Sequence, residues 1–133
     1  MVKVIDASVA VKWFIQEEGS DRALTLLDDF LSNPNNFAVP ELFFFELSNI
    51  LFILSSGRSE QYRELLNLVS QQPIYRSQFT PELQSATEFF QKKGLAGYDA
   101  SYAGLAKLLD GIWVTADKKA HNKIKNLEVS KLL

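Results

Sequence analysis

The sequence predicts an α/β fold in which helices flank a largely parallel central sheet. Strand-like segments alternate with helical segments along the whole chain, a pattern typical of this class. The 133 residues suit one domain of ordinary size, and 47% of them are hydrophobic, including ten Phe, which is enough for a single core. We therefore expect one domain over residues 1–133.

Two short apolar strands and two helical segments are expected in the first third of the chain. Residues 2–5 form a buried strand, and Asp6 at its end leads into an apolar helical segment at 9–15. A helix is expected over 20–31, where apolar residues recur on one face, and a strand over 37–39. The Asn-rich loop between the last two segments separates them.

A helix that is apolar almost all round is expected next, over residues 40–55. Pro40 suits its first position, because the fixed φ of proline fits the first helical turn, and Gly57 lies just beyond its end. Glu46 and Asn49 share one stripe of this helix with aliphatic residues. The Glu46 carboxylate is therefore expected to point inward or into a cleft.

The second half of the chain continues the alternation. Thr80, Pro81 and Glu82 predict a helix start, because they supply a cap, a first-turn proline and an acid at the positive end of the helix dipole. The helix after Asp99 is rich in Ala, Ser and Gly, so it is expected to be slim and to pack close to the sheet. The expected helices are 60–71, 80–93 and 98–110, and the expected strands are 74–79, 112–115 and 127–129.

Composition restricts the kind of site that the chain can build. There are no cysteines and only one histidine, which excludes disulfides and a structural zinc site of the usual kind. Any bound metal must be held by oxygen, which favours Mg²⁺ or Mn²⁺. The net charge is −2, so bulk charge alone does not explain nucleic-acid binding.

Four carboxylates stand against or at the end of apolar segments, where an unpaired charge is costly. They are Asp6, Glu46, Asp99 and Asp117. Singly, an Asp after a strand can be a helix cap, and Asp99 can interact with a helix dipole. Asp6 and Asp117 nevertheless follow two strands, and ligands of parallel sheets collect at the carboxyl ends of the strands. Taken together, the four predict one shared metal site.

Four blocks of sequence resemble the PIN-domain nucleases, and more narrowly the VapC-type ribonuclease toxins of prokaryotic toxin–antitoxin pairs. The blocks are Asp6-Ala7-Ser8, Pro40-Glu41-Leu42 with Glu46-Leu47-Ser48-Asn49, Tyr98-Asp99-Ala100-Ser101-Tyr102, and Val114-Thr115-Ala116-Asp117. The resemblance covers nearly the whole chain. It implies a Mg²⁺- or Mn²⁺-dependent endoribonuclease that forms a homodimer and is held inactive by a cognate antitoxin.

The resemblance also assigns roles to individual residues. Asp6, Glu46, Asp99 and Asp117 correspond to the acidic quartet of the family, and Ser8, Asn49 and Thr115 to supporting polar groups. Glu41 is a rival for Glu46, but only Glu46 precedes the family's triplet of an aliphatic residue, any residue and Asn.

The chemistry of phosphodiester hydrolysis explains such a set of acids. The reaction needs a more acidic attacking water and a neutralised leaving oxygen, and divalent ions held by carboxylates supply both. We expect Asp6 and Asp99 to bind the principal ion directly. Glu46 and Asp117 are expected to contact it through water or to complete a second site.

A basic cluster follows Asp117 at once. It consists of Lys118, Lys119, Lys123 and Lys125, with His121 among them. Its position beside the acids favours RNA phosphate contacts by Lys118, Lys119 and Lys123, and the alternative is an ordinary solvated helix face. His121 is either a general base or a bystander, and metal-activated water favours the latter.

The aromatic run Phe43-Phe44-Phe45 has two interpretations. Exposed aromatics stack on bases of single strands, but a helix that is apolar on every side is more often buried on every side. We therefore favour core or dimer packing. The flank of Phe44 and Leu51 is a candidate contact for a second subunit or an antitoxin.

Other functions and locations are less consistent with the sequence. No apolar run approaches the roughly 18 residues that span a bilayer, and no export leader is recognisable, so we expect a cytoplasmic protein without membrane contact. Receiver and haloacid-phosphatase domains need further acids near Asp6, where this chain has Ala7 and Ser8. The main alternative is a catalytically idle PIN-like module that binds protein or RNA.

Overall fold

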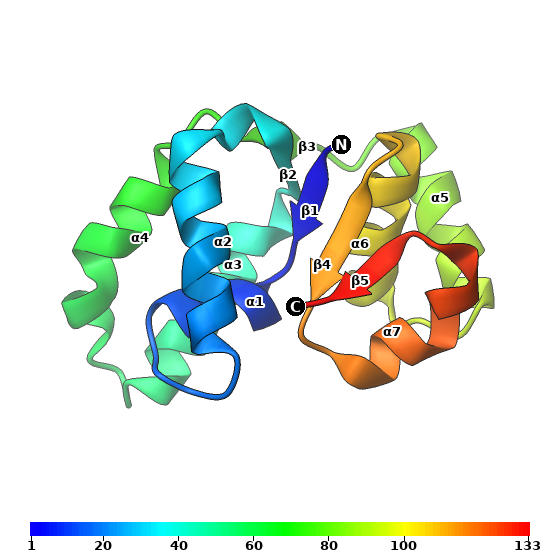
Figure 1. Cartoon of the computed structure of the whole chain (residues 1–133). Helices are drawn as coiled ribbons and strands as arrows, with labels where there is room; N and C mark the ends of the chain where they lie inside the picture. The colour runs from blue at the N-terminus through cyan, green and yellow to red at the C-terminus, as the bar shows by residue number, and fades with distance from the viewer.

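A five-stranded sheet, parallel throughout, forms the centre of the molecule (Figure 1). The computed structural model describes all 133 residues. The strand order is β3-β2-β1-β4-β5, so the first strand lies in the middle. The strands are β1 (Lys3–Ile5), β2 (Phe37–Pro40), β3 (Tyr75–Ser77), β4 (Ile112–Thr115) and β5 (Ser130–Leu132). The predicted α/β class and parallel sheet are confirmed.

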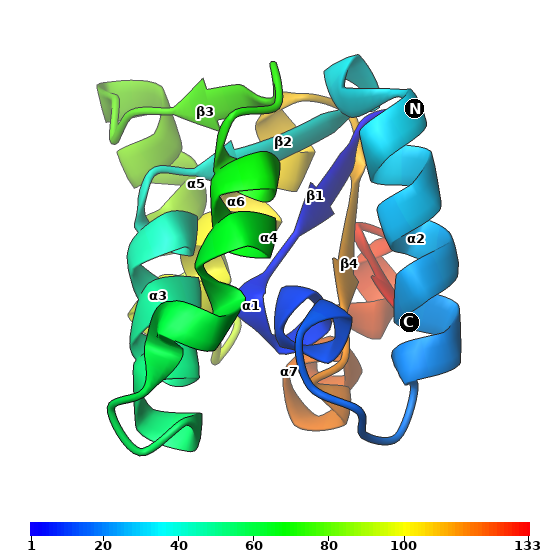
Figure 2. The ribbon, with the colours of Figure 1, turned by 90° about the vertical axis from the view of Figure 1, so that its left-hand side faces the viewer.

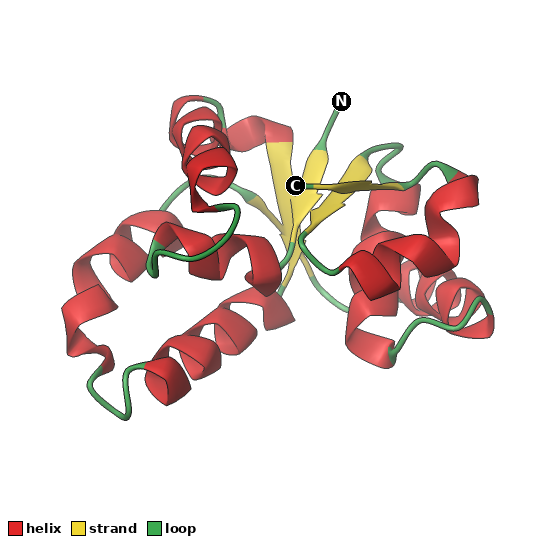
Figure 3. Cartoon of the chain, turned by 60° about the horizontal axis from the view of Figure 1, so that its bottom comes forward, coloured by secondary structure: helices red, strands yellow, loops and turns green.

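Helices cover both faces of the sheet, as Figure 2 and Figure 3 show from two further directions. They are α1 (Ala7–Ala10), α2 (Ser20–Ser32), α3 (Leu42–Leu54), α4 (Arg63–Ser70), α5 (Pro81–Lys92), α6 (Gly97–Leu108) and α7 (Lys118–Ile124). The first four lie on one side of the central strands, and α5, α6 and α7 lie on the other. Short 3₁₀ turns at Val11–Trp13, Pro34–Asn36, Ser59–Tyr62 and Lys125–Leu127 join these elements. None of the helices combines the length and apolarity needed to cross a membrane.

Helix α6 carries Asp99 in its first turn and packs between the sheet and α5. It contacts β1, β2 and β4, and α5 packs against it from outside. Its buried residues from Ala100 to Ala106 are mostly small, as the sequence predicted. A Cβ atom at Gly104 would lie 3.1 Å from backbone atoms of Ala86 and Thr87 in α5. Glycine therefore permits this close approach of the two helices.

Local signals placed several element ends correctly. The Thr80 side chain accepts a hydrogen bond of 3.1 Å from the Leu83 N–H, and Pro81 begins α5, as predicted. The strand at Ile112–Thr115 is also where the sequence predicts it. These ends depend on neighbouring residues, so they can be recognised without tertiary contacts.

Several boundaries differ from the sequence prediction. The helical segment expected at 9–15 begins at Ala7 and ends at Trp13 in a 3₁₀ turn, and the strand expected at 74–79 is limited to Tyr75–Ser77. Pro40 ends β2 instead of beginning α3, and the Glu41 N–H makes the next hydrogen bond, to the Ser77 carbonyl. The predicted helix over 60–71 begins as a 3₁₀ turn and is α-helical only over Arg63–Ser70. The last strand is Ser130–Leu132 and not 127–129, because Glu128 has a φ of +58° and turns the chain before the strand begins.

Helix α3 is less buried than its composition predicts. Only Phe43, Leu47 and Leu51 are buried, whereas several large apolar side chains on the other faces are exposed. The predicted contact flank of Phe44 and Leu51 is wrong, because Leu51 is 1% exposed and Phe44 is partly buried against the core. The exposed large apolar residues of this helix are Phe45, Phe52, Ile53 and Leu54.

Candidate active site

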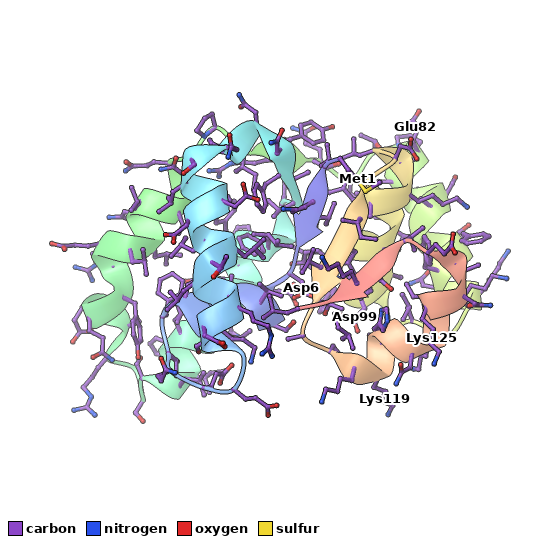
Figure 4. The ribbon with its side chains drawn as sticks, viewed as in Figure 1. Met1, Asp6, Glu82, Asp99, Lys119 and Lys125 are labelled. Atoms are coloured by element: carbon purple, nitrogen blue, oxygen red, sulfur yellow. The ribbon has the colours of Figure 1, made fainter.

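The four predicted carboxylates line one cavity of about 190 Å³. They come from four parts of the chain, namely the end of β1, helix α3, the first turn of α6 and the end of β4. Figure 4 labels two of them, Asp6 and Asp99, beside the lower ends of β1 and β4. The lining residues are Asp6, Ala7, Ser8, Glu46, Ile50, Asp99, Tyr102 and Asp117.

Asp6 is the most buried of the four acids, with 5% of its surface exposed. It caps α1 through a hydrogen bond of 3.2 Å from the Val9 N–H to Oδ1. Ser8 Oγ donates to the same oxygen at 2.5 Å, and the Trp113 indole Nε1 donates to Oδ2 at 2.9 Å. Burial raises the pKa of Asp6 in spite of these hydrogen bonds. The cap therefore does not remove the cost of the buried charge.

Ser8 and Thr115 connect the ends of the two central strands. Besides its bond to Asp6, Ser8 Oγ accepts the Ala116 N–H at 3.1 Å and lies 3.4 Å from Thr115 Oγ1. Thr115 Oγ1 in turn accepts the Asp117 N–H at 3.1 Å. The Asp117 carboxylate caps α7 by accepting the Ala120 N–H at 3.0 Å. These hydrogen bonds fix the positions of Asp6 and Asp117 relative to each other.

Asn49 is not brought to the cavity with the other predicted polar residues. Its side chain is exposed, and the next residue of the helix, Ile50, lines the cavity instead. An α-helix turns by about 100° per residue, so Asn49 lies on a different face from Ile50. The structure thus gives Asn49 no supporting contact at the acids.

Glu46 and Asp99 are partly buried and repel the other acids. Burial raises the pKa of Glu46, and the charges of Asp6 and Asp99 raise it further, against a hydrogen bond from Tyr102. Burial also raises the pKa of Asp99, together with the charges of Asp117 and Asp6, and Lys123 opposes this. The cavity therefore concentrates negative charge that nothing within it neutralises fully.

The side chains that line the cavity offer the ligands that a hard divalent cation prefers, because their polar atoms are all carboxylate or hydroxyl oxygens. The positions of the side chains are less favourable. No group of three or more His, Cys, Asp or Glu side chains is arranged so that it could hold one ion. Direct binding by three of the acids would therefore require some of their side chains to turn.

Comparison with known proteins identifies the family of this fold and cavity. The family model described as PIN domain matches residues 3–126, which is nearly the whole chain. The chain belongs to the PIN domain family. The family resemblance drawn from the sequence is thereby confirmed. No curated protein matches the chain at a significant level.

Solved structures share the fold of this PIN domain along almost its full length. PAE2754 from Pyrobaculum aerophilum has a TM-score of 0.72 and 20% identity, covering 99% of this chain and 89% of its own. VapBC2 from Rickettsia felis, bound to a promoter DNA fragment, has a TM-score of 0.72 and 18% identity, covering 100% and 99%. FitAcB from Neisseria gonorrhoeae has a TM-score of 0.71 and 14% identity, covering 99% and 96%. At these identities the likeness shows the fold.

The basic cluster of the PIN domain lies on α7 and in the 3₁₀ turn after it, next to the cavity. Its lysines, Lys118, Lys119, Lys123 and Lys125, are all exposed, and Figure 4 labels Lys119 and Lys125 at the outer side of this region. Lys123 Nζ donates to the Gly94 carbonyl at 3.0 Å. His121 does not line the cavity, and its Nδ1 lies 2.8 Å from Ser130 Oγ. The placement gives His121 no contact with the acids.

Two aromatic residues at the acids were not recognised in the sequence. Tyr102 and Trp113 each donate a hydrogen bond to one of the four carboxylates. Tyr102 carries a local signal, because it lies three residues after Asp99 and so shares a helix face with it. Trp113 carries none, because its partner Asp6 is 107 positions away in the chain.

Proposed function

We propose that this PIN domain is a metal-dependent endoribonuclease and the toxin of a VapBC-type toxin–antitoxin pair, acting in the cytoplasm. One observation carries the proposal. Four carboxylates from four separate elements line a single cavity at the carboxyl ends of β1 and β4. The stability of the fold does not require this arrangement, because the ionised acids repel one another. Perturbed acids gathered in one cleft are typical of catalytic sites.

Asp6 and Asp99 would hold the principal Mg²⁺ or Mn²⁺ directly, and Glu46 and Asp117 would contact it through water or complete a second site. When bound, such an ion acidifies the attacking water and neutralises charge on the leaving oxygen. Ser8 and Thr115 keep Asp6 and Asp117 in place through the hydrogen bonds described above. Lys118, Lys119 and Lys123 would contact phosphates of the RNA beside the scissile bond.

Two protein partners belong to the proposal. The structures similar to this chain include VapBC2 from Rickettsia felis and a toxin–antitoxin complex from Klebsiella pneumoniae, which supports a cognate antitoxin for this chain. A second copy of the chain is supported by an apolar cavity of about 490 Å³ that opens between α3, α5 and α6. Exposed Phe45, Phe79 and Tyr98 line it, and exposed aromatic surface of this kind is typical of protein interfaces.

The test is cleavage of total bacterial RNA by the purified protein. We expect cleavage with Mg²⁺ or Mn²⁺ and none with excess EDTA. Asp99→Asn should abolish cleavage while the circular dichroism spectrum stays unchanged, because Asp99 accepts no hydrogen bond that the fold needs. Asp28→Asn is the matched control, because Asp28 is an exposed aspartate on α2 away from the cavity. Uncut RNA with the wild-type protein, or full cleavage by Asp99→Asn, would reject the nuclease.

The alternative is a catalytically idle PIN-like module that binds protein or RNA. One observation favours it, namely that no three acids are arranged to hold one ion. This alternative predicts that RNA is retained on the protein but is left intact at every Mg²⁺ and Mn²⁺ concentration. The same RNA samples, analysed by a binding assay in parallel with the cleavage assay, separate the two functions.

A further inference from the structure

We propose that Tyr102 and Trp113 form a stacked pair of positioning residues that fixes the carboxylates of Glu46 and Asp6 for the divalent cation. This inference rests on the proposed function. Neither residue belongs to the acidic quartet or to its predicted polar supports. Their role follows from contacts that join four elements of the fold at the cavity.

Each ring donates a hydrogen bond to a different acid. The Tyr102 hydroxyl of α6 donates to Glu46 Oε1 of α3 at 2.6 Å. The Trp113 indole of β4 donates to Asp6 Oδ2, at the end of β1, at 2.9 Å. A hydrogen bond to an ionised carboxylate is stronger than a neutral one. Two acids far apart in the sequence are therefore tied to two adjacent rings.

The two rings cannot easily move independently of each other. Their centroids are 6.4 Å apart, and their planes are inclined by 13°, so they are stacked. Tyr102 is 1% exposed and Trp113 is fully buried. Close packing leaves such side chains a single position. The pair thus acts as one rigid support with two donors.

The pair also decides which carboxylate oxygens are free. Glu46 uses only Oε1 for an internal hydrogen bond, which leaves Oε2 for a cation or its water. Asp6 Oδ1 accepts two hydrogen bonds, from Ser8 Oγ and the Val9 N–H, which use both of its lone pairs. Asp6 Oδ2 accepts only the Trp113 N–H, so one of its two lone pairs can still contact a cation. Donors behind metal-binding carboxylates typically raise metal affinity 10- to 100-fold.

The two tryptophans provide a spectroscopic test with an internal control. The Trp113 indole N–H donates to Asp6, whereas the Trp13 indole N–H donates to the Ala23 carbonyl at 2.8 Å, outside the cavity. A ¹H–¹⁵N spectrum of the labelled protein should show one indole signal for each. Stepwise addition of Mg²⁺ should move the Trp113 signal and leave the Trp13 signal in place. The movement gives the Kd of the metal.

Tyr102→Phe is the decisive variant, because it keeps the stacked ring and removes only the hydroxyl. We expect the Mg²⁺ Kd to rise about tenfold, with unchanged folding. Tyr75→Phe is the matched control, because Tyr75 is 53% exposed on β3 and lines neither this cavity nor the apolar one. Its Kd should equal that of the wild-type protein.

Trp113 is tested without removing the buried ring. Asp6→Asn should move the Trp113 indole signal in the absence of metal, because the ionised acceptor is lost, and should leave the Trp13 signal unchanged. An unmoved Trp113 signal in this variant would reject the role of Trp113. An equal Mg²⁺ Kd for the wild-type protein and Tyr102→Phe would reject the role of Tyr102.

The outcomes separate this inference from the proposed function. If Mg²⁺ moves the Trp113 signal with the same Kd in the wild-type protein and in Tyr102→Phe, and RNA is cleaved, the nuclease stands and the positioning pair is rejected. If neither Mg²⁺ nor Mn²⁺ affects either indole signal and RNA stays intact, the metal site itself is rejected, and the pair with it.

Discussion

The close approach of α5 and α6 predicts the effect of replacing Gly104 by alanine. The added Cβ would lie 3.1 Å from the Ala86 carbonyl carbon and the Thr87 nitrogen. Favourable contacts between carbon atoms begin near 3.5 Å, so the helices must separate by roughly 0.4 Å, the difference 3.5 − 3.1. Both neighbours are backbone atoms, which cannot turn aside as a flexible side chain can.

Two opposing contributions determine the change in the free energy of unfolding. Overpacking a tight contact costs about 1 to 3 kcal/mol. Alanine favours the helix over glycine by about 1 kcal/mol, which offsets part of this cost. We expect a net loss of about 1 kcal/mol and a Tm lower by about 4 °C for a chain of this length. Cleavage should fall as well, because Asp99 and Tyr102 move with α6.

Thermal unfolding followed by circular dichroism measures this effect. Gly97→Ala is the control, because Gly97 lies at the start of α6 and its added Cβ would meet only the flexible Gln91 side chain, at 3.4 Å. Its Tm should equal or exceed that of the wild-type protein. A Gly104→Ala protein that melts at or above the wild-type Tm would refute the packing argument.

Two further predictions concern charge at the cavity. The pKa values of Asp6, Glu46 and Asp99 are higher in the folded state than their ordinary values near 4, so the folded protein binds protons more tightly than the unfolded chain. The protonated acids therefore stabilise the fold below about pH 4, and this stability is lost as pH rises through the raised pKa values. Calorimetry should therefore show a higher Tm for the metal-free protein near pH 5 than near pH 7. Mg²⁺ should raise the Tm at pH 7, and Asp99→Asn should weaken both effects. A Tm that is independent of pH and of Mg²⁺ would contradict this reasoning. In an uncleaving Asp99→Asn background, Lys118→Ala with Lys119→Ala should weaken RNA binding and lower the slope of log affinity against log salt by about 0.7 per lysine. Arg58→Ala with Arg63→Ala is the control, because it removes the same number of positive charges from an exposed region near α4. An equal loss of slope in this control would show that Lys118 and Lys119 are ordinary solvated surface residues.

Much of the fold and the identity of the four acids could be predicted from the sequence, because both leave local signals. The alternation of apolar strands with helices predicts the α/β class, and the Thr80 cap is recognisable from its neighbours. A carboxylate beside an apolar segment is conspicuous wherever its partners lie. Asp6 and Asp117 could even be placed at one edge of the sheet, because parallel strands end there together.

Only the tertiary structure decided how the acids are held and which neighbours serve them. The partners of Asp6 and Glu46 are 107 and 56 positions away, so no local pattern indicates the Trp113 and Tyr102 hydrogen bonds. The same holds for α3, because periodicity describes which residues share a helix face but not which face another element covers. Asn49 and Phe45 are therefore exposed, whereas Glu46, between them in the sequence, reaches the cavity.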